Sequence, residues 1–391
     1  MNHSENTVNG GKGTVQPVRF MALAAGVEPI QKGHMASLAP AMDRDPEVIV
    51  FNLKQRYTGV SATVNALVPI QSGQWRLGYC GTRLSNGVDG MSLGDAFRIS
   101  RRPPPGRAFR IWHVRRDHEM VAGLLARDVF RLPIRLAFTS AAQRRHGKFP
   151  RWLIGKMDAV IATTLQAAAC VPNTTAVVPH GVDLNRFVPV QDRFTAWQAS
   201  GLPGQFGIGN FGRIRPDKGT DVFVDAMLQA LPNLPGVTAV IAGQARPEHA
   251  AFLHSLKQKV IDAGLSDRIH FLGEIPAHEV HLWYQRCLLC VACPREEPFG
   301  LTPFEAAATA SVVVCSRTGA FEHLIDPGVN GELVPTGDPK ALADAVYSVM
   351  SNPYRAMRMG QQARLDVASR FSLQAEADGI GRVYTSLFED H

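Results

Sequence analysis

Short apolar segments alternate with helical stretches along most of the chain, and the alternation starts again after a polar stretch near residues 189–203. Short apolar runs bounded by charges or turn residues are typical of strands buried on both faces. Strands that alternate with helices form parallel sheets covered by helices. The sequence therefore predicts an α/β protein with two doubly wound, Rossmann-like domains that face each other across a cleft. The expected strands are 48–53, 110–114, 134–139, 159–164, 205–212, 237–243, 268–273, 288–293, 311–316 and 331–335.

The restart of the pattern gives the expected domain boundaries. We expect a partly disordered lead-in over residues 1–46, an N-terminal domain over 47–188 and a C-terminal domain over 189–372. Residues 373–391 are predicted to form one final helix. Open α/β sheets bind ligands beyond the carboxyl ends of their strands, so the cleft is the expected binding site.

Composition limits the class of protein. Hydrophobic residues make up 45% of the chain and charged residues 19%, which is typical of a globular protein with a large core. A disordered chain and a disulfide-stapled scaffold are excluded. The N-terminus is polar, no apolar run reaches the roughly 18 residues of a membrane span, and six cysteines give no disulfide framework. The sequence therefore predicts a cytoplasmic protein.

Positive charge is concentrated in one segment. Between Arg98 and Lys156 stand 15 basic residues against three acids, an excess of +12, so the rest of the chain sums to 7 − 12 = −5. Such a segment is either a solvated face or a surface for an anionic partner. No nucleic-acid-binding signature accompanies it, so we expect no nucleic acid. The candidate surface is an aromatic–basic cluster for an anionic membrane or acceptor, made of Arg144, Arg145, Lys148, Arg151 and Trp152, with Phe149 between them.

Three motif-like patterns fail on their context. Gly207, Gly209 and Gly212 match the dinucleotide fingerprint, but no strand precedes the first glycine and no acid ends the next strand. Cys287, Cys290 and Cys293 have iron–sulfur-like spacing, but they lie on an apolar strand and are expected to fill the core. The histidines near residue 280 lack metal-ligand spacing. We therefore expect neither a nicotinamide cofactor nor a metal.

The segment Gly212–Gly219 joins an expected strand to an expected helix. Its glycines let the backbone approach a ligand closely, while Arg213 and Lys218 supply fixed positive charge. This combination suits a pyrophosphate.

A second junction carries two carboxylates, Glu297 and Glu305, on either side of the helix-start amides of Phe299, Gly300 and Leu301. Helix-start amides bind anions, and carboxylates accept hydrogen bonds from hydroxyl groups. A ligand with an anion between two hydroxyl-bearing groups fits this pattern. A third strand–glycine–helix junction stands at Gly319, and its backbone could close over a hydroxyl-bearing group of that ligand, such as a sugar. Together the three junctions predict a nucleotide-sugar pocket.

The second half resembles the retaining glycosyltransferases of family 4, which have the GT-B fold. The resemblance is carried by FGRIRPDKG, EPFGLTPFE and TGAFEHLIDPGVNGELVPTGDPKALADAV, with PHGVDLNRF at the domain border, and it covers residues 47–388. Within that family, KQRYTGVSATV, RIWHVRRDHEM and FTSAAQRRHGKFPRWLIGKMDAVIATT are similar to lipopolysaccharide-core mannosyltransferases.

The resemblance implies roles for the residues of the motifs. Arg213, Lys218 and Glu297 match the catalytic set: two cations that stabilise the diphosphate leaving group and an acid near the donor hexose. The donor-binding set implied is Gly59, Gly212, Phe299, Gly300, Leu301, Glu305 and Gly319, with Glu305 on the ribose. Many relatives have a histidine where Phe138 stands here, so His113 and His118 become candidates near the reacting carbon.

The resemblance also implies an activity. It implies transfer of a hexose onto a lipopolysaccharide core or related anionic glycolipid. The hexose is expected to be mannose, with GDP-mannose as the donor. The resemblance further implies that no metal is needed and that the enzyme works at the inner face of the plasma membrane. The N-terminal domain would hold the acceptor, and the final helix would pack on it. A nucleotide-sugar epimerase or hydrolase on the same fold, and a transferase using another donor such as UDP-glucose, are the alternatives.

Overall fold

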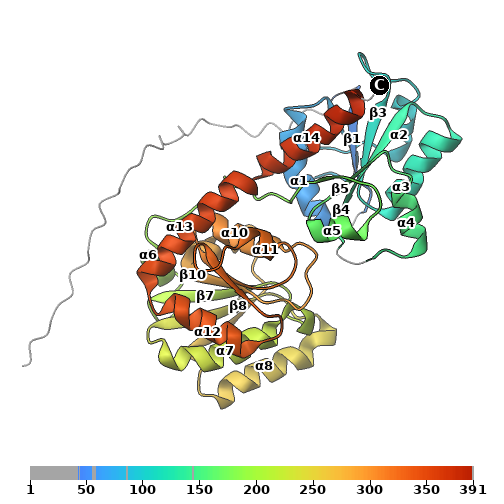
Figure 1. The fold of residues 1–391 in the computed structure, drawn as a ribbon. Helices are drawn as coiled ribbons and strands as arrows, with labels where there is room; N and C mark the ends of the chain where they lie inside the picture. Colours follow the sequence, from blue (N-terminus) through green and yellow to red (C-terminus); the bar gives the residue numbers. More distant parts are fainter. Residues whose placement is uncertain (1–42, 44, 55–58, 85–86, 143–144, 390–391) are drawn as a thin grey trace, which may run out of the picture. The chain divides into compact units, whose positions relative to one another are not determined.

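The structure is a computed structural model that describes residues 43, 45–54, 59–84, 87–142 and 145–389. The predicted lead-in over residues 1–46 therefore lies almost wholly outside the described residues. Two six-stranded sheets account for the strands, and all their strand pairs are parallel. The predicted architecture of two doubly wound α/β domains is confirmed (Figure 1).

The first sheet has the strand order β2-β1-β3-β4-β5-β6. Its strands are β1 (Val48–Asn52), β2 (Leu77–Gly81), β3 (Arg110–Val114), β4 (Ile134–Ser140), β5 (Ala159–Ala162) and β6 (Thr174–Val177). The helices of this half are α1 (Gly59–Ser72), α2 (Leu93–Ile99), α3 (Asp117–Leu124), α4 (Lys148–Ile154) and α5 (Leu165–Cys170), and α3 continues into a π-helical turn, η1 (Leu125–Val129).

The second sheet has the strand order β12-β11-β10-β7-β8-β9. Its strands are β7 (Phe206–Phe211), β8 (Val237–Ala242), β9 (Ile269–Gly273), β10 (Cys287–Ala292), β11 (Val312–Ser316) and β12 (Gly331–Val334). The helices of this half are α6 (Arg193–Gln198), α7 (Thr220–Ala230), α8 (Ala250–Asp262), α9 (Val280–Arg286), α10 (Leu301–Ala308), α11 (Phe321–Leu324), α12 (Pro339–Met350), α13 (Pro353–Arg370) and α14 (Leu373–Glu389), with short 3-10 turns η2 (Pro216–Lys218), η3 (Leu231–Asn233) and η4 (Pro247–His249).

Two strands were not among the expected ones. β2 carries two glycines among its five residues, Leu77–Gly81, which weakens its apolar pattern. β6 is an edge strand whose residues alternate between half-buried and exposed, so no apolar run marks it. Both strands form because a neighbouring strand offers a parallel partner, and this tertiary pairing overrides weak local signals.

Each sheet is covered by apolar helix faces on both sides. On the first sheet, α1 and α14 share one core with β1, while α2, α3 and α4 pack on the other face. On the second sheet, α7, α8 and α12 cover one face and α6, α9 and α10 the other. Within the described ranges, no helix has both the length and the apolar composition needed to cross a membrane.

The end of the chain returns to the first sheet. α14 lies alongside α1 (Figure 1) and adds Leu373, Ala377, Ile380 and Tyr384 to the core of β1. Where the chain crosses between the sheets, the Glu376 carboxylate accepts hydrogen bonds from Nδ1 of His180 (2.8 Å) and from the Gly181 amide (2.7 Å). This crossing fixes His180 beside the second domain's loops.

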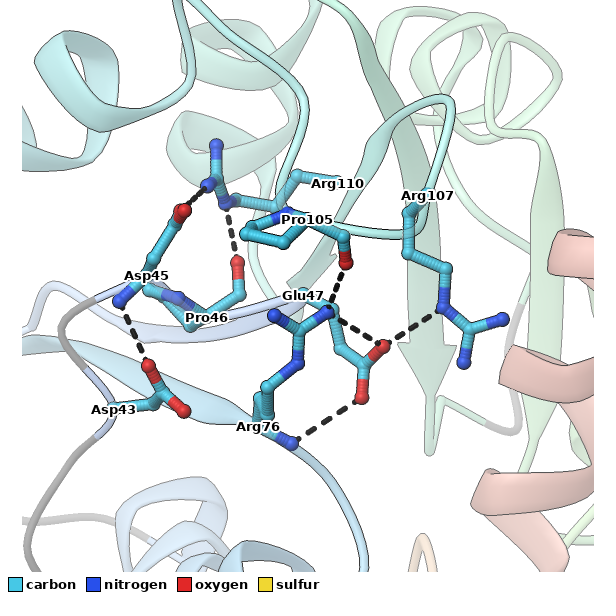
Figure 2. A network of polar contacts seen from close by, with 8 residues as sticks. All are labelled: Asp43, Asp45, Pro46, Glu47, Arg76, Pro105, Arg107 and Arg110. Atoms are coloured by element: carbon cyan, nitrogen blue, oxygen red, sulfur yellow. Dashed lines mark hydrogen bonds and ion pairs between the residues drawn. The ribbon is translucent and has the colours of Figure 1, made fainter.

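Much of the positive charge between residues 98 and 156 is neutralised within the fold. Figure 2 shows Arg110 paired with Asp45 and Arg107 paired with Glu47. Nη2 of Arg110 lies 2.5 Å from Asp45, and Nε of Arg107 lies 2.8 Å from Glu47. Asp158 likewise pairs with Arg127 and Arg135 at 2.7 and 3.0 Å. These three acids lie outside the segment in which the excess was counted. The surface excess is therefore smaller than the sequence sum indicates.

Arg110 gives a test of this internal network. Its fully buried guanidinium also donates to the carbonyls of Pro46, Ile99 and Arg102. After Arg110→Met the half-exposed Asp45 carboxylate can be solvated by water, but three carbonyls lose this donor. Leaving buried polar groups unsatisfied costs about 1–3 kcal/mol. We expect a loss of that size in the free energy of unfolding, measured by urea denaturation. Arg101→Met, at an exposed position of the same segment, should leave the midpoint nearly unchanged; equal midpoints for the two variants would contradict the prediction.

Candidate functional site

The loop after β7 is held in place by a left-handed glycine. Gly219 has φ 70° and precedes α7, and a Cβ there would collide with the Cys293 carbonyl at the end of β10. Only glycine fits both the backbone angle and the close approach. Arg295 fixes the same loop, because its backbone amide donates to the Asp217 carbonyl at 2.8 Å and its guanidinium donates to the Pro216 carbonyl. The guanidinium also bonds both carboxylate oxygens of Asp221, in the first turn of α7, at 2.9 and 2.8 Å. The 212–219 loop is thus anchored to the end of the neighbouring strand.

One of the two predicted cations pairs with a predicted acid at these strand ends. Nζ of Lys218 lies 2.5 Å from Oε2 of Glu297, and both side chains are partly exposed. Arg213, together with Lys218 and Glu297, lines a small cavity of about 80 Å³. Partial burial, with Arg215 and Arg246 nearby, lowers the pKa of the Arg213 guanidinium. This concentration of positive charge suits a polyanion such as a diphosphate.

The loop between β10 and α10 depends on Gly300. Its φ is 82°, and a Cβ there would lie 2.5 Å from the Phe321 ring and 2.7 Å from Cγ of Glu297. Gly319 packs against the same loop with φ 64°, where a Cβ would be 2.8 Å from the Phe299 carbonyl. The three junctions predicted from the sequence therefore lie side by side. The buried Phe299 ring contacts the His180 ring, 4.9 Å between centroids, and Leu301 is the first residue of α10.

Glu305 lies inside α10 and accepts a hydrogen bond from the Tyr284 hydroxyl at 3.1 Å. Burial raises the pKa of the Glu305 carboxyl, while the Tyr284 hydrogen bond and Arg186 oppose that effect. A desolvated carboxylate is a strong acceptor for ligand hydroxyls. Tyr284 comes from α9, 21 positions earlier, and no motif in the sequence linked it to Glu305.

Three cavities follow one another along the carboxyl ends of the second sheet. The first, about 430 Å³, is lined by Arg213, Arg246, Glu274 and Tyr284. The small cavity at Lys218 shares Gly212 and Arg213 with it. The third, about 700 Å³, shares Glu297 and Gly300 with the small one and is also lined by Glu305 and by residues of the first domain. Thr302 lines all three cavities. The arrangement can hold an elongated ligand with its anionic centre at Arg213 and Lys218.

The histidine candidates lie elsewhere. His113 is fully buried on β3, with Nδ1 2.5 Å from the Tyr384 hydroxyl and Nε2 2.7 Å from the Thr139 hydroxyl. Burial lowers its pKa well below the usual range, so it is a neutral core residue. His118 is about half exposed, 54%, on α3, and like His113 it lines none of the three cavities. Gly59 is the first residue of α1, and the loop before it, 55–58, lies outside the described residues.

The first domain contributes cavity-lining residues that sequence reasoning missed. Arg115 follows β3, Thr139 and Ser140 end β4, and His146 precedes α4. The signal that singled out Arg213, a charged residue directly after a strand, was also available for Arg115. No glycine stands beside Arg115, so the strand–glycine–helix pattern that marked the other junctions was absent and the residue was missed.

The cysteines behave as predicted. Cys287, Cys290 and Cys293 are buried and free, and burial raises the pKa of Cys293 to about 12. They fill the core as thiols. Across the described parts of the chain, no group of three or more His, Cys, Asp or Glu side chains is arranged to hold a metal ion.

An exposed aromatic pair stands on α4. Phe149 and Trp152 are 60% and 55% exposed, and their rings stack with centroids 6.2 Å apart. Arg145, Lys148 and Arg151 are exposed beside them, while Arg144 lies outside the described residues. Trp152 is thus not a core residue of its domain. We call Arg145, Lys148, Phe149, Arg151 and Trp152 the α4 patch.

Known proteins similar to this chain in sequence are named as glycosyl- or mannosyltransferases. Residues 197–366 match the family model described as glycosyl transferases group 1. The lipopolysaccharide core biosynthesis mannosyltransferase LpcC of Rhizobium leguminosarum bv. viciae is 43% identical over 352 residues, which cover 89% of this chain and 98% of LpcC. The mannosyltransferase LpsB of Rhizobium meliloti, with the same descriptive name, is 42% identical over 88% of this chain and 98% of LpsB.

Solved structures share the fold. HepE of Anabaena in complex with UDP has a TM-score of 0.75 at 18% identity, covering 87% of this chain and 99% of HepE. Sucrose-phosphate synthase of Thermosynechococcus elongatus has a TM-score of 0.67 at 19% identity, and the match covers 88% of this chain and 99% of the synthase. These likenesses confirm the GT-B architecture. Identity of 43% over nearly the whole of LpcC goes further than a shared fold, and the chain therefore belongs to the group 1 glycosyltransferases, as its strand–glycine–helix motifs predicted.

Proposed function

We propose that this glycosyltransferase moves mannose from GDP-mannose, with retained anomeric configuration, onto a lipopolysaccharide core or a related anionic glycolipid. The observation that carries the proposal is the 43% identity to a protein named as a lipopolysaccharide core mannosyltransferase, over 98% of its length. The run of three cavities along the second sheet supports a nucleotide-sugar donor.

The proposed donor occupies that run with its diphosphate at Arg213 and Lys218. Nucleoside and ribose extend toward Glu305 and Tyr284, and the hexose lies by Glu297, at the border of the large cavity. Positioned cations stabilise negative charge as it develops on the leaving diphosphate. These side chains do what Mg²⁺ does in other transferases, so we propose that no metal ion is required. Lys218 would exchange its Glu297 partner, at 2.5 Å, for the diphosphate.

A panel of sugar nucleotides tests the donor. A ligand that binds only the folded state raises the unfolding temperature. We expect GDP-mannose to raise the unfolding temperature more than UDP-glucose does at equal concentration. We also expect mannose to be transferred from GDP-mannose to an acceptor. Stronger protection by UDP-glucose would contradict the mannosyl assignment. Release of mannose or its epimer with donor alone, at the rate seen with an acceptor, would instead support the hydrolase or epimerase alternative.

The cation pair gives a prediction about donor binding. Arg213→Ala or Lys218→Ala removes a charge-assisted contact to the diphosphate, worth about 1.5–3 kcal/mol. GDP affinity measured by calorimetry should fall accordingly. Because Lys218 also pairs with Glu297, the effects of Lys218→Ala and Glu297→Gln on turnover should not add in the double variant. If both alanine variants bind GDP like the parent, the diphosphate site is elsewhere.

Substitutions of the two carboxylates should have different effects on GDP binding and on turnover. Glu305→Gln should weaken GDP binding, because the ribose loses a charged acceptor. Glu297→Gln should largely spare GDP binding but reduce turnover, because Glu297 is proposed to face the hexose. A chelator should leave the activity of the parent enzyme unchanged.

The raised pKa of Glu305 also predicts a pH dependence. GDP affinity of the parent should fall as the pH drops through that pKa, and the fall should start at a higher pH than for an ordinary glutamate. The Glu305→Gln variant should lack this component; the same defect in both variants would refute the division of roles.

We propose that the α4 patch docks the enzyme on the anionic inner leaflet of the plasma membrane. Exposed Phe149 and Trp152 support it, because aromatic rings beside basic residues favour the membrane interface. Each basic residue near such a surface contributes about 1 kcal/mol, screened over about 8–10 Å.

Vesicle sedimentation tests this docking. Changing Arg144, Arg145, Lys148 and Arg151 to Gln should abolish binding to vesicles containing phosphatidylglycerol, and high salt should weaken binding of the parent. In the matched control, four exposed basic residues of the second domain are changed to Gln, which removes the same total charge. These residues are Lys257, Lys259, Lys340 and Arg358. Equal loss in the control would show a general charge effect and contradict a specific patch.

A further inference from the structure

The wall that the first domain contributes to the 700 Å³ cavity contains polar atoms without partners. Nε and Nη2 of Arg115, Oγ of Ser140 and Nε2 of His146 are buried, and none of the described residues supplies them with a hydrogen bond. All three residues line this cavity. Buried polar groups are normally paired, so three such side chains on one cavity wall point to a ligand that pairs them.

The fold brings these groups to one edge. β3 and β4 are parallel neighbours, with Val114 paired to Phe138. Arg115 directly follows β3 and Ser140 ends β4, so both side chains leave the same end of the sheet. His146 belongs to the connection between β4 and α4. The position of the wall is therefore set by the sheet itself.

Glu119 and Glu376, the two carboxylates that favour the charged form of Arg115, are bound to other donors. Glu119 accepts from the backbone amides of Leu53 and Arg115 and from the Arg116 guanidinium, at 3.0, 2.8 and 3.2 Å. Glu376 is bound to His180 and the Gly181 amide. Arg115 is 7% exposed, and burial lowers its pKa although Glu376 opposes that shift. A buried guanidinium of this kind gains from an anionic ligand that supplies two oxygens.

We propose that Arg115, Ser140 and His146 form a subsite for the anionic group, carboxylate or phosphate, of an acidic sugar in the acceptor. The inference rests on the proposed function, since the same cavity reaches Glu297, Gly300 and Glu305 on the donor side. Arg115 and the Ser140 hydroxyl donate to the anionic oxygens, and His146 adds a third contact. Asp117, on the same wall, is a suitable acceptor for the hydroxyl groups of a sugar ring.

Three simple sugars test the subsite: glucuronate for a carboxylate, glucose 6-phosphate for a phosphate, and glucose as the neutral reference. Affinities are measured by ligand-observed NMR titration at constant ionic strength. We expect one of the two anionic sugars to bind at least about tenfold more tightly than glucose, as charge-assisted hydrogen bonds require. The preferred one identifies the anionic group. Binding of both no better than glucose would overturn the proposal.

Arg115→Met keeps the length of the side chain and removes the charge. It should lower the affinity for the anionic sugar to the affinity for glucose, while the affinity for GDP stays at the parent value. Arg101→Met, at an exposed position, is the matched control and should change neither. An equal loss of GDP affinity in Arg115→Met would assign Arg115 to the donor diphosphate and overturn the acceptor subsite.

Ser140→Ala provides a second test if Arg115→Met does not fold. It should lower the affinity for the anionic sugar several-fold, since one hydrogen bond of about 1 kcal/mol is lost, and leave glucose and GDP unaffected. An unchanged anionic-sugar affinity in this variant would count against the subsite. Because these titrations contain no GDP-mannose, a failure of the donor assignment and a failure of the subsite give different results.

Discussion

The parallel direction of every strand in the second sheet is the constraint on which the site depends. Parallel strands send all their carboxyl ends to one edge, so the loops after β7, β10 and β11 meet although they are far apart in sequence. The loops then fit only because Gly219, Gly300 and Gly319 permit left-handed angles and close backbone approach. Lys218 and Glu297, 79 positions apart, come within 2.5 Å of each other through this arrangement.

The apolar runs and the strand–glycine–helix junctions were enough to predict the fold and the loops of the second domain. Strands such as β1 (VIVFN) and β11 (VVVCS) are marked by runs of apolar residues, and the glycines and charges near strand ends are local signals. β2 and β6 escaped because neighbouring strands, not their own residues, hold them in the sheet. The histidine candidates show the converse limit, since a polar residue near a strand end need not face a cavity. His113 is polar and near a strand end, yet its side chain faces Tyr384 in the core.

Charge shows the same limit of sequence reasoning. A sum along the chain cannot include acids that arrive from elsewhere, as Glu47 does at Arg107. Nor can it identify a cation that lacks a partner, because Arg115 and Arg110 look alike in the sequence. Arg110 has four hydrogen-bond acceptors around it, whereas two nitrogens of Arg115 have none within the described structure. The difference between a structural and a ligand-binding arginine is therefore a property of the fold.

The return of α14 to the first sheet has a consequence for biosynthesis. The core around β1 needs Ile380 and Tyr384, which leave the ribosome after the whole second domain. Domains usually fold as they emerge, the N-terminal one first. Here the first domain emerges first but is completed last, and its α14-facing apolar surface stays open while roughly 200 further residues are made. Truncation or stalled synthesis before α14 therefore yields a chain with an exposed core, a substrate for chaperones and proteases.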